Sequence, residues 1–223
     1  MYNIMYEGNN MVIKYLGHAC FSVKNNEGNV LVCDPFDKSI GYSMIKVNAN
    51  VVTMSHMHHD HNNTLQIEGD FDIVNTPQIY SNYGFNISYL KTYHDEFKGR
   101  KRGDNIIYII ECDGVKICHT GDLGHMLNNR HLAEIHDISV LCIPVGGVYT
   151  IDKQTINKLT RKLKDKIIIP MHYKTDKCQL PINKLDNYLK TTFLHTYKIN
   201  ELTIDKDNID TFLPGNYVLK IKE

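Results

Sequence analysis

The first half of the chain consists of short apolar runs separated by clusters of turn-forming residues. Runs of this length, bounded by glycine, asparagine, aspartate or proline, are typical of β-strands. The pattern predicts a β-meander at the start and a second meander with a tight hairpin turn at Asp113-Gly114. The strands are expected at residues 11–16, 19–23, 30–33, 51–54, 73–74, 87–93, 105–111 and 115–118.

Beyond Gly121 the apolar runs become nearly continuous, which is typical of strands covered on both faces. We expect such strands at residues 138–144 and 167–170, and a closing strand at 217–221; the rest of residues 195–223 has no interpretation. Helices are expected to start at Asp152 and at Pro181. Their apolar faces are Ile156, Leu159 and Leu163 in the first, and Ile182, Leu185, Leu189 and Phe193 in the second.

Two groups of strands with helices outside them predict an α/β protein in which two sheets pack together between helical layers, a four-layer αβ/βα sandwich. The length of 223 residues fits one domain over residues 1–223. The longest apolar stretch, residues 138–145, is far shorter than the ~20 residues of a membrane helix. Residues 1–10 have neither a basic start nor an apolar core, so we expect no export signal and a cytoplasmic protein.

The charge balance is neutral, with 25 basic and 25 acidic residues. No overall field therefore favours nucleic acid or a membrane as partner, and a homo-oligomer stays open. Six cysteines are scattered without a C-x-x-C pair, and we interpret them as reduced thiols. They are Cys20, Cys33, Cys112, Cys118, Cys142 and Cys178.

Residues 56–61, with the sequence HMHHDH, follow an apolar run and therefore form a loop at a strand end. Alternate side chains of an extended or turn segment share a side, so His56, His58 and Asp60 can converge while His61 faces a second point. Imidazole and carboxylate suit zinc, iron or manganese, and the cluster lacks the cysteine typical of purely structural zinc sites. Two adjacent metal sites are predicted. The alternative is a solvated histidine-rich loop or an adventitious metal site.

This H-x-H-x-D-H pattern resembles the hallmark of the metallo-β-lactamase superfamily. Residues 15–21, 33–36, 119–124 and 169–173 resemble further motifs of its lactonase-like, metal-dependent hydrolase branch, in the same order along the chain. The resemblance implies the metallo-β-lactamase fold and a site with two divalent metal ions. Zinc is favoured, with manganese and iron as alternatives.

The resemblance also implies which residues bind the metals. His56, His58 and His94 would bind one ion, Asp60, His61 and His172 the other, and Asp122 would bridge the two. His94 rests on the short match Tyr93-His94-Asp95, and its alternative is a loop histidine paired with an acidic neighbour. His172 and Asp122 each follow an apolar strand, and their alternatives are a helix cap and a surface turn.

Four further residues are candidates for orienting a ligand or contacting substrate. His18 and His119 lie in the motif segments but outside the ligand pattern, and each is alternatively a structural histidine. Asp34 could accept a hydrogen bond from a ligand imidazole, or form a turn before Pro35. Arg102 lies in the basic stretch 98–103, which could attract an anionic substrate or form a solvated hairpin. The remaining histidines are interpreted as surface residues: His59, His125, His131, His136 and His195.

Two metals about 3.5–4 Å apart can share a water and lower its pKa toward about 7. The predicted function is therefore hydrolysis of an ester-type bond of a small molecule, a lactone or a phosphodiester, by a metal-bridging hydroxide, with Asp60 as ligand and orienting residue. Asp122 argues against penicillin hydrolysis, because β-lactamases of this superfamily usually carry cysteine or another arrangement there. An iron-dependent oxidoreductase or dioxygenase, or a non-catalytic metal-binding protein, is the alternative; His58 stands where diiron oxygen reductases usually carry glutamate.

Overall fold

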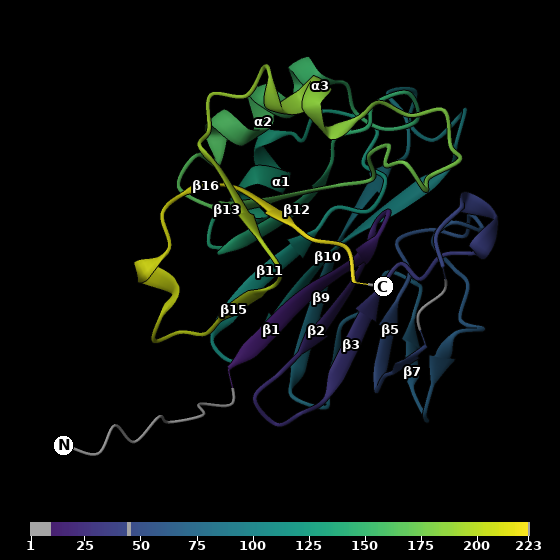
Figure 1. Cartoon of the computed structure of the whole chain (residues 1–223), viewed down its shortest axis with the longest axis vertical. Helices are drawn as coiled ribbons and strands as arrows, with labels where there is room; N and C mark the ends of the chain where they lie inside the picture. The colour runs from purple at the N-terminus through teal and green to yellow at the C-terminus, as the bar shows by residue number, and fades with distance from the viewer. Residues whose placement is uncertain (1–9, 44–45, 223) are drawn as a thin grey trace.

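The computed structural model describes residues 10–43 and 46–222, which form two β-sheets packed face to face with α-helices along one outer side (Figure 1). The absence of an export signal, predicted from residues 1–10, concerns a segment that lies outside the described residues except for Asn10. Among the described residues, none of the helices has the length and apolar character needed to span a bilayer. The single domain over residues 1–223 and the homo-oligomer stay predictions.

The six-stranded sheet begins with the predicted meander and has the strand order β15-β1-β2-β3-β5-β7. β1, β2 and β3 pair antiparallel, whereas β3, β5 and β7 are parallel to one another. The strands are β1 Met11–Gly17, β2 Cys20–Lys24, β3 Val30–Cys33, β5 Val51–Thr53, β7 Asp72–Val74 and β15 Leu202–Ile204. The expected strands in residues 11–74 are all present, within two residues of their predicted bounds.

The eight-stranded sheet has the order β14-β16-β13-β12-β11-β10-β9-β8. Its β9, β10 and β11 form the predicted second meander, and β8, which was not predicted, extends it. β11, β12 and β13 are parallel. β12 and β13 are buried at every position, as their continuous apolar sequences predicted. The strands are β8 Tyr80–Asn82, β9 Phe85–Tyr93, β10 Asp104–Cys112, β11 Val115–His119, β12 Val140–Pro144, β13 Ile167–Met171, β14 Thr196–Ile199 and β16 Gly215–Leu219.

Alternation along β3 divides the apolar side chains between two clusters. Leu31 and Cys33 belong to the main core, which lies between the sheets and under the helices. Val32 belongs to a smaller cluster with Phe36 and Tyr42. In the described part of the chain, the segment that contributes to this smaller cluster contains the 3₁₀ helix Lys38–Ile40 and the two-stranded β4 Val47–Asn48 and β6 Ile67–Glu68, with no α-helix. The α/β sandwich is confirmed, and its outer layer on this side is built without an α-helix in that region.

The first predicted helix is confirmed and the second is wrong in its start. Asp152 caps α2, Lys153–Lys162, because its carboxylate accepts a hydrogen bond from the Thr155 N–H at 2.7 Å. The second helix, α3, is only Leu185–Leu189 and begins after Lys184. Asn183 is held instead by backbone hydrogen bonds, donating to Gly146 and accepting from Lys174, each at 2.8 Å. The remaining helices are α1 Asn129–Glu134 and the 3₁₀ helix Ile209–Thr211.

The C-terminal segment, for which the sequence predicted only a closing strand, contributes strands to both sheets. β15 pairs with β1, whereas β14 and β16 lie at the edge of the eight-stranded sheet beyond β13. The predicted strand 217–221 is displaced, because β16 is Gly215–Leu219 and Ile221 forms only an isolated bridge with Tyr15. The C-terminal segment therefore crosses from one sheet to the other.

Candidate metal centre

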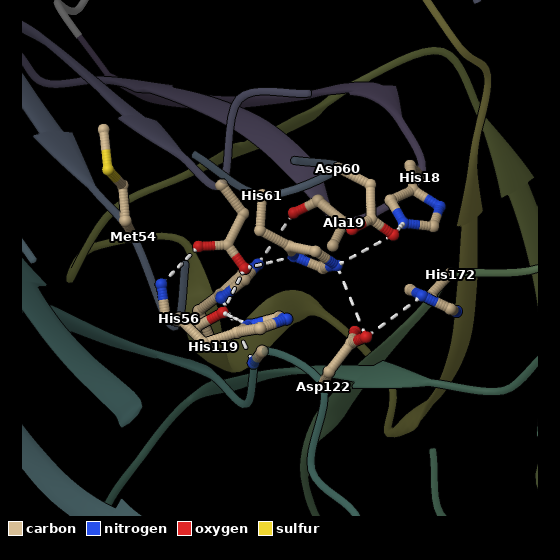
Figure 2. A network of polar contacts seen from close by, with 12 residues as sticks. His18, Ala19, Met54, His56, Asp60, His61, His119, Asp122 and His172 are labelled. Carbon is tan, nitrogen blue, oxygen red and sulfur yellow. Dashed lines mark hydrogen bonds and ion pairs between the residues drawn. The ribbon is translucent and has the colours of Figure 1, made fainter. Parts of the chain in front are cut away.

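The predicted ligands follow strands of both sheets and meet at one edge of the sandwich. The histidine cluster follows β5 of the six-stranded sheet. His94, Asp122 and His172 follow β9, β11 and β13 of the eight-stranded sheet. Strand ends thus bring residues from four separate parts of the sequence into one polar cluster (Figure 2).

Three histidines form the first group of this cluster. The ligating atoms of His56, His58 and His94 all lie within 4.8 Å of one another. The ring centroid of His56 lies 4.6 Å from that of His58 and 4.8 Å from that of His94. His56 and His94 are buried, whereas His58 is exposed. The first group is therefore buried in the protein at His56 and His94 and open to solvent at His58.

The second group contains the other three predicted ligands and one additional histidine. The ligating atoms of Asp60, His61, His172 and His18 also lie within 4.8 Å of one another. His18 Nε2 is 3.1 Å from Asp60 Oδ2, and the His18 ring is 4.0 Å from the His172 ring. His18, a candidate for orienting a ligand, therefore contacts two of the predicted ligands.

Asp122 lies between the two groups. Its Oδ2 is 3.1 Å from Nε2 of His94, 3.2 Å from Nε2 of His172 and 3.4 Å from Nε2 of His61. Figure 2 shows the carboxylate facing the His61 and His172 rings. One oxygen thus contacts both groups, as a bridging ligand requires. All seven predicted ligands come together, and their role in binding metal stays a prediction.

Asp34 and Ser55 orient histidines of both groups. Asp34 accepts from His61 Nδ1 at 2.8 Å and from the Ser55 hydroxyl at 2.6 Å. Because Ser55 Oγ donates to Asp34, it accepts from His56 Nδ1 at 2.9 Å. This arrangement leaves Nε2 of both histidines available for a metal. The predicted contact of Asp34 is present, whereas Ser55 was missed although it directly precedes His56.

Substituting Ser55 with alanine is expected to weaken metal binding by about 10–100-fold, because His56 loses the acceptor that fixes its ring. Metal affinity measured by competition with a chromophoric chelator tests this. Thr53→Val is the matched control, since Thr53 is buried on the same segment and its hydroxyl has no hydrogen-bond partner within the described residues. Equal affinities of Ser55→Ala and Thr53→Val would show that Ser55 does not orient His56.

Asn105 holds the loop that carries Asp122 and was not found from the sequence. Its Oδ1 accepts from the Asp122 N–H at 2.9 Å, and its Nδ2 donates to the Thr120 carbonyl at 3.0 Å. A Cβ at Gly121 would overlap Ser55 and Asn105, so only glycine permits this close approach. An asparagine at the start of a predicted strand gives no signal of such a role in the sequence.

His119 and Arg102 lie outside the two groups of ligands. His119 Nε2 donates to the Ala19 carbonyl at 2.8 Å, and its Nδ1 accepts from the Gly121 N–H at 3.3 Å. It therefore ties the Asp122 loop to the segment after His18, the structural alternative. Arg102 lies on a neighbouring loop, where its Nη2 donates to the Val148 carbonyl at 3.4 Å. The five histidines interpreted as surface residues contribute to neither group.

Unpartnered buried atoms in the cluster fit metal ions. Within the described ranges, Nε2 of His56, Nε2 of His61 and Oδ1 of Asp122 are buried without a hydrogen-bond partner. Buried polar atoms normally have partners, and their concentration here indicates a ligand. All donor atoms in the cluster are nitrogen or oxygen. The six cysteines are buried thiols without disulfide bonds, and they lie elsewhere in the fold. The donor set suits a catalytic divalent ion such as zinc.

The charges and the burial of the metal-free cluster set the protonation states of these ligands. Burial, followed by the neighbouring His61, lowers the pKa of His56 to about 3, so its imidazole is neutral at ordinary pH. Burial alone would raise the pKa of Asp122, but His172 and His61 outweigh it and hold the pKa well below its usual value. Burial by itself would lower the pKa of His61. Asp122 and Asp34 raise it by more, so the net pKa lies well above its usual value. The neutral imidazole of His56 and the ionised carboxylate of Asp122 are the forms that bind a metal, whereas His61 has to lose a proton when a metal binds.

Several residues of the cluster adopt strained backbone conformations. His18, Asp34 and His172 have φ values of 55°, 42° and 51°, in the left-handed region that non-glycine residues rarely occupy. The carbonyl of His18 accepts hydrogen bonds from the His172 N–H at 2.6 Å and the Tyr15 hydroxyl at 2.7 Å. Such strain persists where surrounding contacts enforce it, and it concentrates at functional sites.

The chain matches the sequence model of the Beta-lactamase superfamily domain over residues 12–172, which is most of its length. The chain belongs to the metallo-β-lactamase superfamily. The match contains all the predicted ligands, and it confirms the resemblance found in the sequence motifs.

Relatives within this superfamily are named UPF0173 metal-dependent hydrolases. The one from Thermoplasma volcanium is 28% identical over 187 residues, 71% of this chain and 82% of the relative. The one from Nanoarchaeum equitans is 27% identical over 223 residues, 88% of this chain and 98% of the relative. A Thermotoga maritima crystal structure, assigned to the Zn-dependent hydrolases of the superfamily, has a TM-score of 0.76 and 34% identity, covering 95% of this chain and 100% of that one.

Proposed function

We propose that this protein is a binuclear metal-dependent hydrolase that cleaves an ester-type bond, in a lactone or a phosphodiester. The observation that carries the proposal is the position of Asp122, whose single oxygen Oδ2 contacts histidines of both ligand groups. The metal-dependent hydrolase names of the relatives support the general activity.

Each predicted ligand has a place in this proposal. His56, His58 and His94 would hold one ion, Asp60, His61 and His172 would hold the other, and Asp122 would bind both. Zinc is the favoured ion, because the donors are imidazole and carboxylate and because the Thermotoga maritima relative is assigned as Zn-dependent. Manganese and iron are the alternatives. When bound, such a pair of ions supplies an activated water at neutral pH and polarises the acceptor oxygen of the substrate.

The residues of the chain provide the orientation. Asp60 is the proposed catalytic residue, and His18 Nε2 fixes its carboxylate by donating to Oδ2 at 3.1 Å. Burial by itself would raise the pKa of Asp60. The hydrogen bond from His18 and the charge of His61 lower the pKa by more, so the carboxylate is ionised. The ionised Asp60 can therefore serve as a metal ligand and orient the attacking water while its side chain stays in place.

An iron-dependent oxidoreductase is the alternative, because this chemistry occurs on the same fold. CmlA from Streptomyces venezuelae, a diiron β-hydroxylase, matches with a TM-score of 0.60 over 95% of this chain and 53% of its own. Its identity of 10% shows a shared fold alone. In this chain His58 belongs to the first ligand group, at the position where diiron oxygen reductases of the superfamily usually carry glutamate.

Hydrolysis of bis(p-nitrophenyl) phosphate and of a lactone panel, with oxygen uptake recorded in parallel, tests the proposal. We expect hydrolysis without oxygen consumption, and a loss of at least about 100-fold in Asp60→Ala and His172→Ala, which remove proposed ligands. His59→Ala is the matched control, because His59 is an exposed histidine of the same loop outside both groups. Oxygen consumption without hydrolysis would overturn the proposal, and unchanged activity in both variants would refute the site.

A further inference from the structure

A cavity of about 490 Å³ lies between three loops next to the metal centre. Its walls come from residues 95–97, 101–102, 124–126, 148–152 and 155. The side chains that line it include the cations Lys101 and Arg102, the aromatic rings of Phe97 and Tyr149, and the imidazole of His125. None of the predicted metal ligands is among the lining residues.

Two walls of the cavity continue segments that carry a predicted ligand, and the third packs against one. Asp95 directly follows His94 in the sequence. Gly124 lies two residues after Asp122 and packs so tightly that an added Cβ would overlap the backbone of His94 and Asp95. The third loop leaves the sheet at Gly146, where an added Cβ would overlap the carbonyl of His172. The cavity is therefore adjacent to the ligand cluster.

The cations of the cavity have no acidic partners among the described residues. Arg102 donates to the Val148 carbonyl at 3.4 Å, and its guanidinium lies 5.6 Å from the centre of the Tyr149 ring. Lys101 Nζ lies 3.9 Å from the centre of the Phe97 ring. Arginine presents five donors in a planar fork, so most of the donors of Arg102 remain for a ligand.

The carboxylates of the cavity are largely engaged elsewhere. Asp95 is buried, and its oxygens accept four backbone hydrogen bonds of 2.7–3.0 Å from Phe97, Gly99, Lys101 and Arg102. Asp152 caps helix α2. Only Glu96 remains without such a bond, and its side chain is exposed. Asp95 thus fixes the loop that presents the two cations.

We propose that this cavity binds an anionic group of the substrate, a phosphate or a carboxylate, through the guanidinium of Arg102 with Lys101 beside it. Because no predicted ligand lines the cavity, the anionic group is separate from the bond that is cleaved. This inference rests on the proposed hydrolase function and narrows its substrate to an ester that carries a second, negatively charged group.

Kinetics of the zinc-loaded protein test the inference with an unsubstituted γ-lactone and the same lactone carrying a carboxylate on its ring. Arg102→Gln is expected to raise KM for the carboxylated lactone about tenfold or more, as loss of a charge-assisted hydrogen bond does, with kcat and the neutral lactone little changed. Arg100→Gln, an exposed arginine of the same loop outside the cavity, is the matched control. No change in Arg102→Gln, or equal changes for both lactones, would overturn the inference.

Binding of inorganic phosphate to the zinc-loaded protein, measured by calorimetry, separates this inference from the proposed function. Arg102→Gln should weaken phosphate binding by about tenfold or more, and Arg102→Lys should weaken it less. Weakened phosphate binding in a protein that hydrolyses neither lactones nor phosphodiesters would support the anion site and refute the hydrolase. Unchanged phosphate binding in a protein that hydrolyses lactones would do the reverse.

Discussion

Replacing Asp122 with asparagine is expected to lower metal affinity and hydrolytic activity by at least about 100-fold, the upper range for residues that only orient a ligand. The amide keeps the shape of the side chain but removes the charge that attracts the metal ions. Asp122 Oδ2 contacts His61, His94 and His172 at 3.1–3.4 Å, so both ligand groups lose their shared partner. Metal content after dialysis and kcat/KM, measured on the same preparation, check the expectation.

Asp113→Asn is the control for the Asp122 variant. Asp113 is a partly buried aspartate at the hairpin turn between β10 and β11, and it accepts a hydrogen bond from the Asn26 N–H at 2.8 Å. It makes no contact with the ligand groups, so its substitution should leave metal content and activity near those of the parent protein. An Asp122→Asn protein that keeps two metal ions and full activity would exclude a bridging role.

Removing the metals is expected to lower the midpoint of thermal unfolding by at least about 8–16 °C, which is the shift for a single ion. An ion present at 1,000 times its dissociation constant stabilises the folded state by about 4.1 kcal/mol. For a chain of this size, 1 kcal/mol corresponds to about 2–4 °C. The physical reason is that buried imidazole and carboxylate atoms without partners, such as His56 Nε2 and Asp122 Oδ1, gain ligand bonds. Scanning calorimetry of chelator-treated protein, before and after adding zinc, measures the shift.

His172→Ala provides the control for this thermal shift. Without His172 the second group loses one of its three predicted ligands, so zinc should stabilise the variant much less than the parent protein. His136→Ala should keep the full shift, because His136 is an exposed histidine outside both ligand groups whose Nδ1 hydrogen-bonds to the Ala133 carbonyl. A shift of equal size in all three proteins would place the zinc outside this cluster.

The part of the site that is local in sequence could be predicted most directly. His56, His58, Asp60 and His61 lie within six residues, so their spacing alone indicated two metal positions. His94, Asp122 and His172 needed the family resemblance, because strands β9, β11 and β13 bring them to the cluster only in the folded chain. The strands could be predicted from short apolar runs bounded by turn-forming residues, which are also local in sequence.

Long-range hydrogen bonds explain what the sequence did not reveal. Ser55 orients His56 through Asp34, which is 21 residues away, and Asn105 holds Asp122 across 17 residues. Neither contact has a local pattern. The predicted start of α3 was wrong because of long-range hydrogen bonds as well. The backbone of Asn183 pairs with Gly146 and Lys174 instead of forming the first turn of a helix. Tertiary hydrogen bonds there outweigh the local preference of Pro181 for the first helical turn.

The central claim, a hydrolase that needs two metal ions, is tested most directly by titrating the chelator-treated protein with zinc. The rate of hydrolysis of bis(p-nitrophenyl) phosphate, or of a lactone that the protein cleaves, is recorded against zinc equivalents per chain. We predict that the rate rises from near zero and reaches its maximum at two equivalents, because the two ligand groups share Asp122. A maximum at one equivalent, or full activity without metal, would contradict the claim.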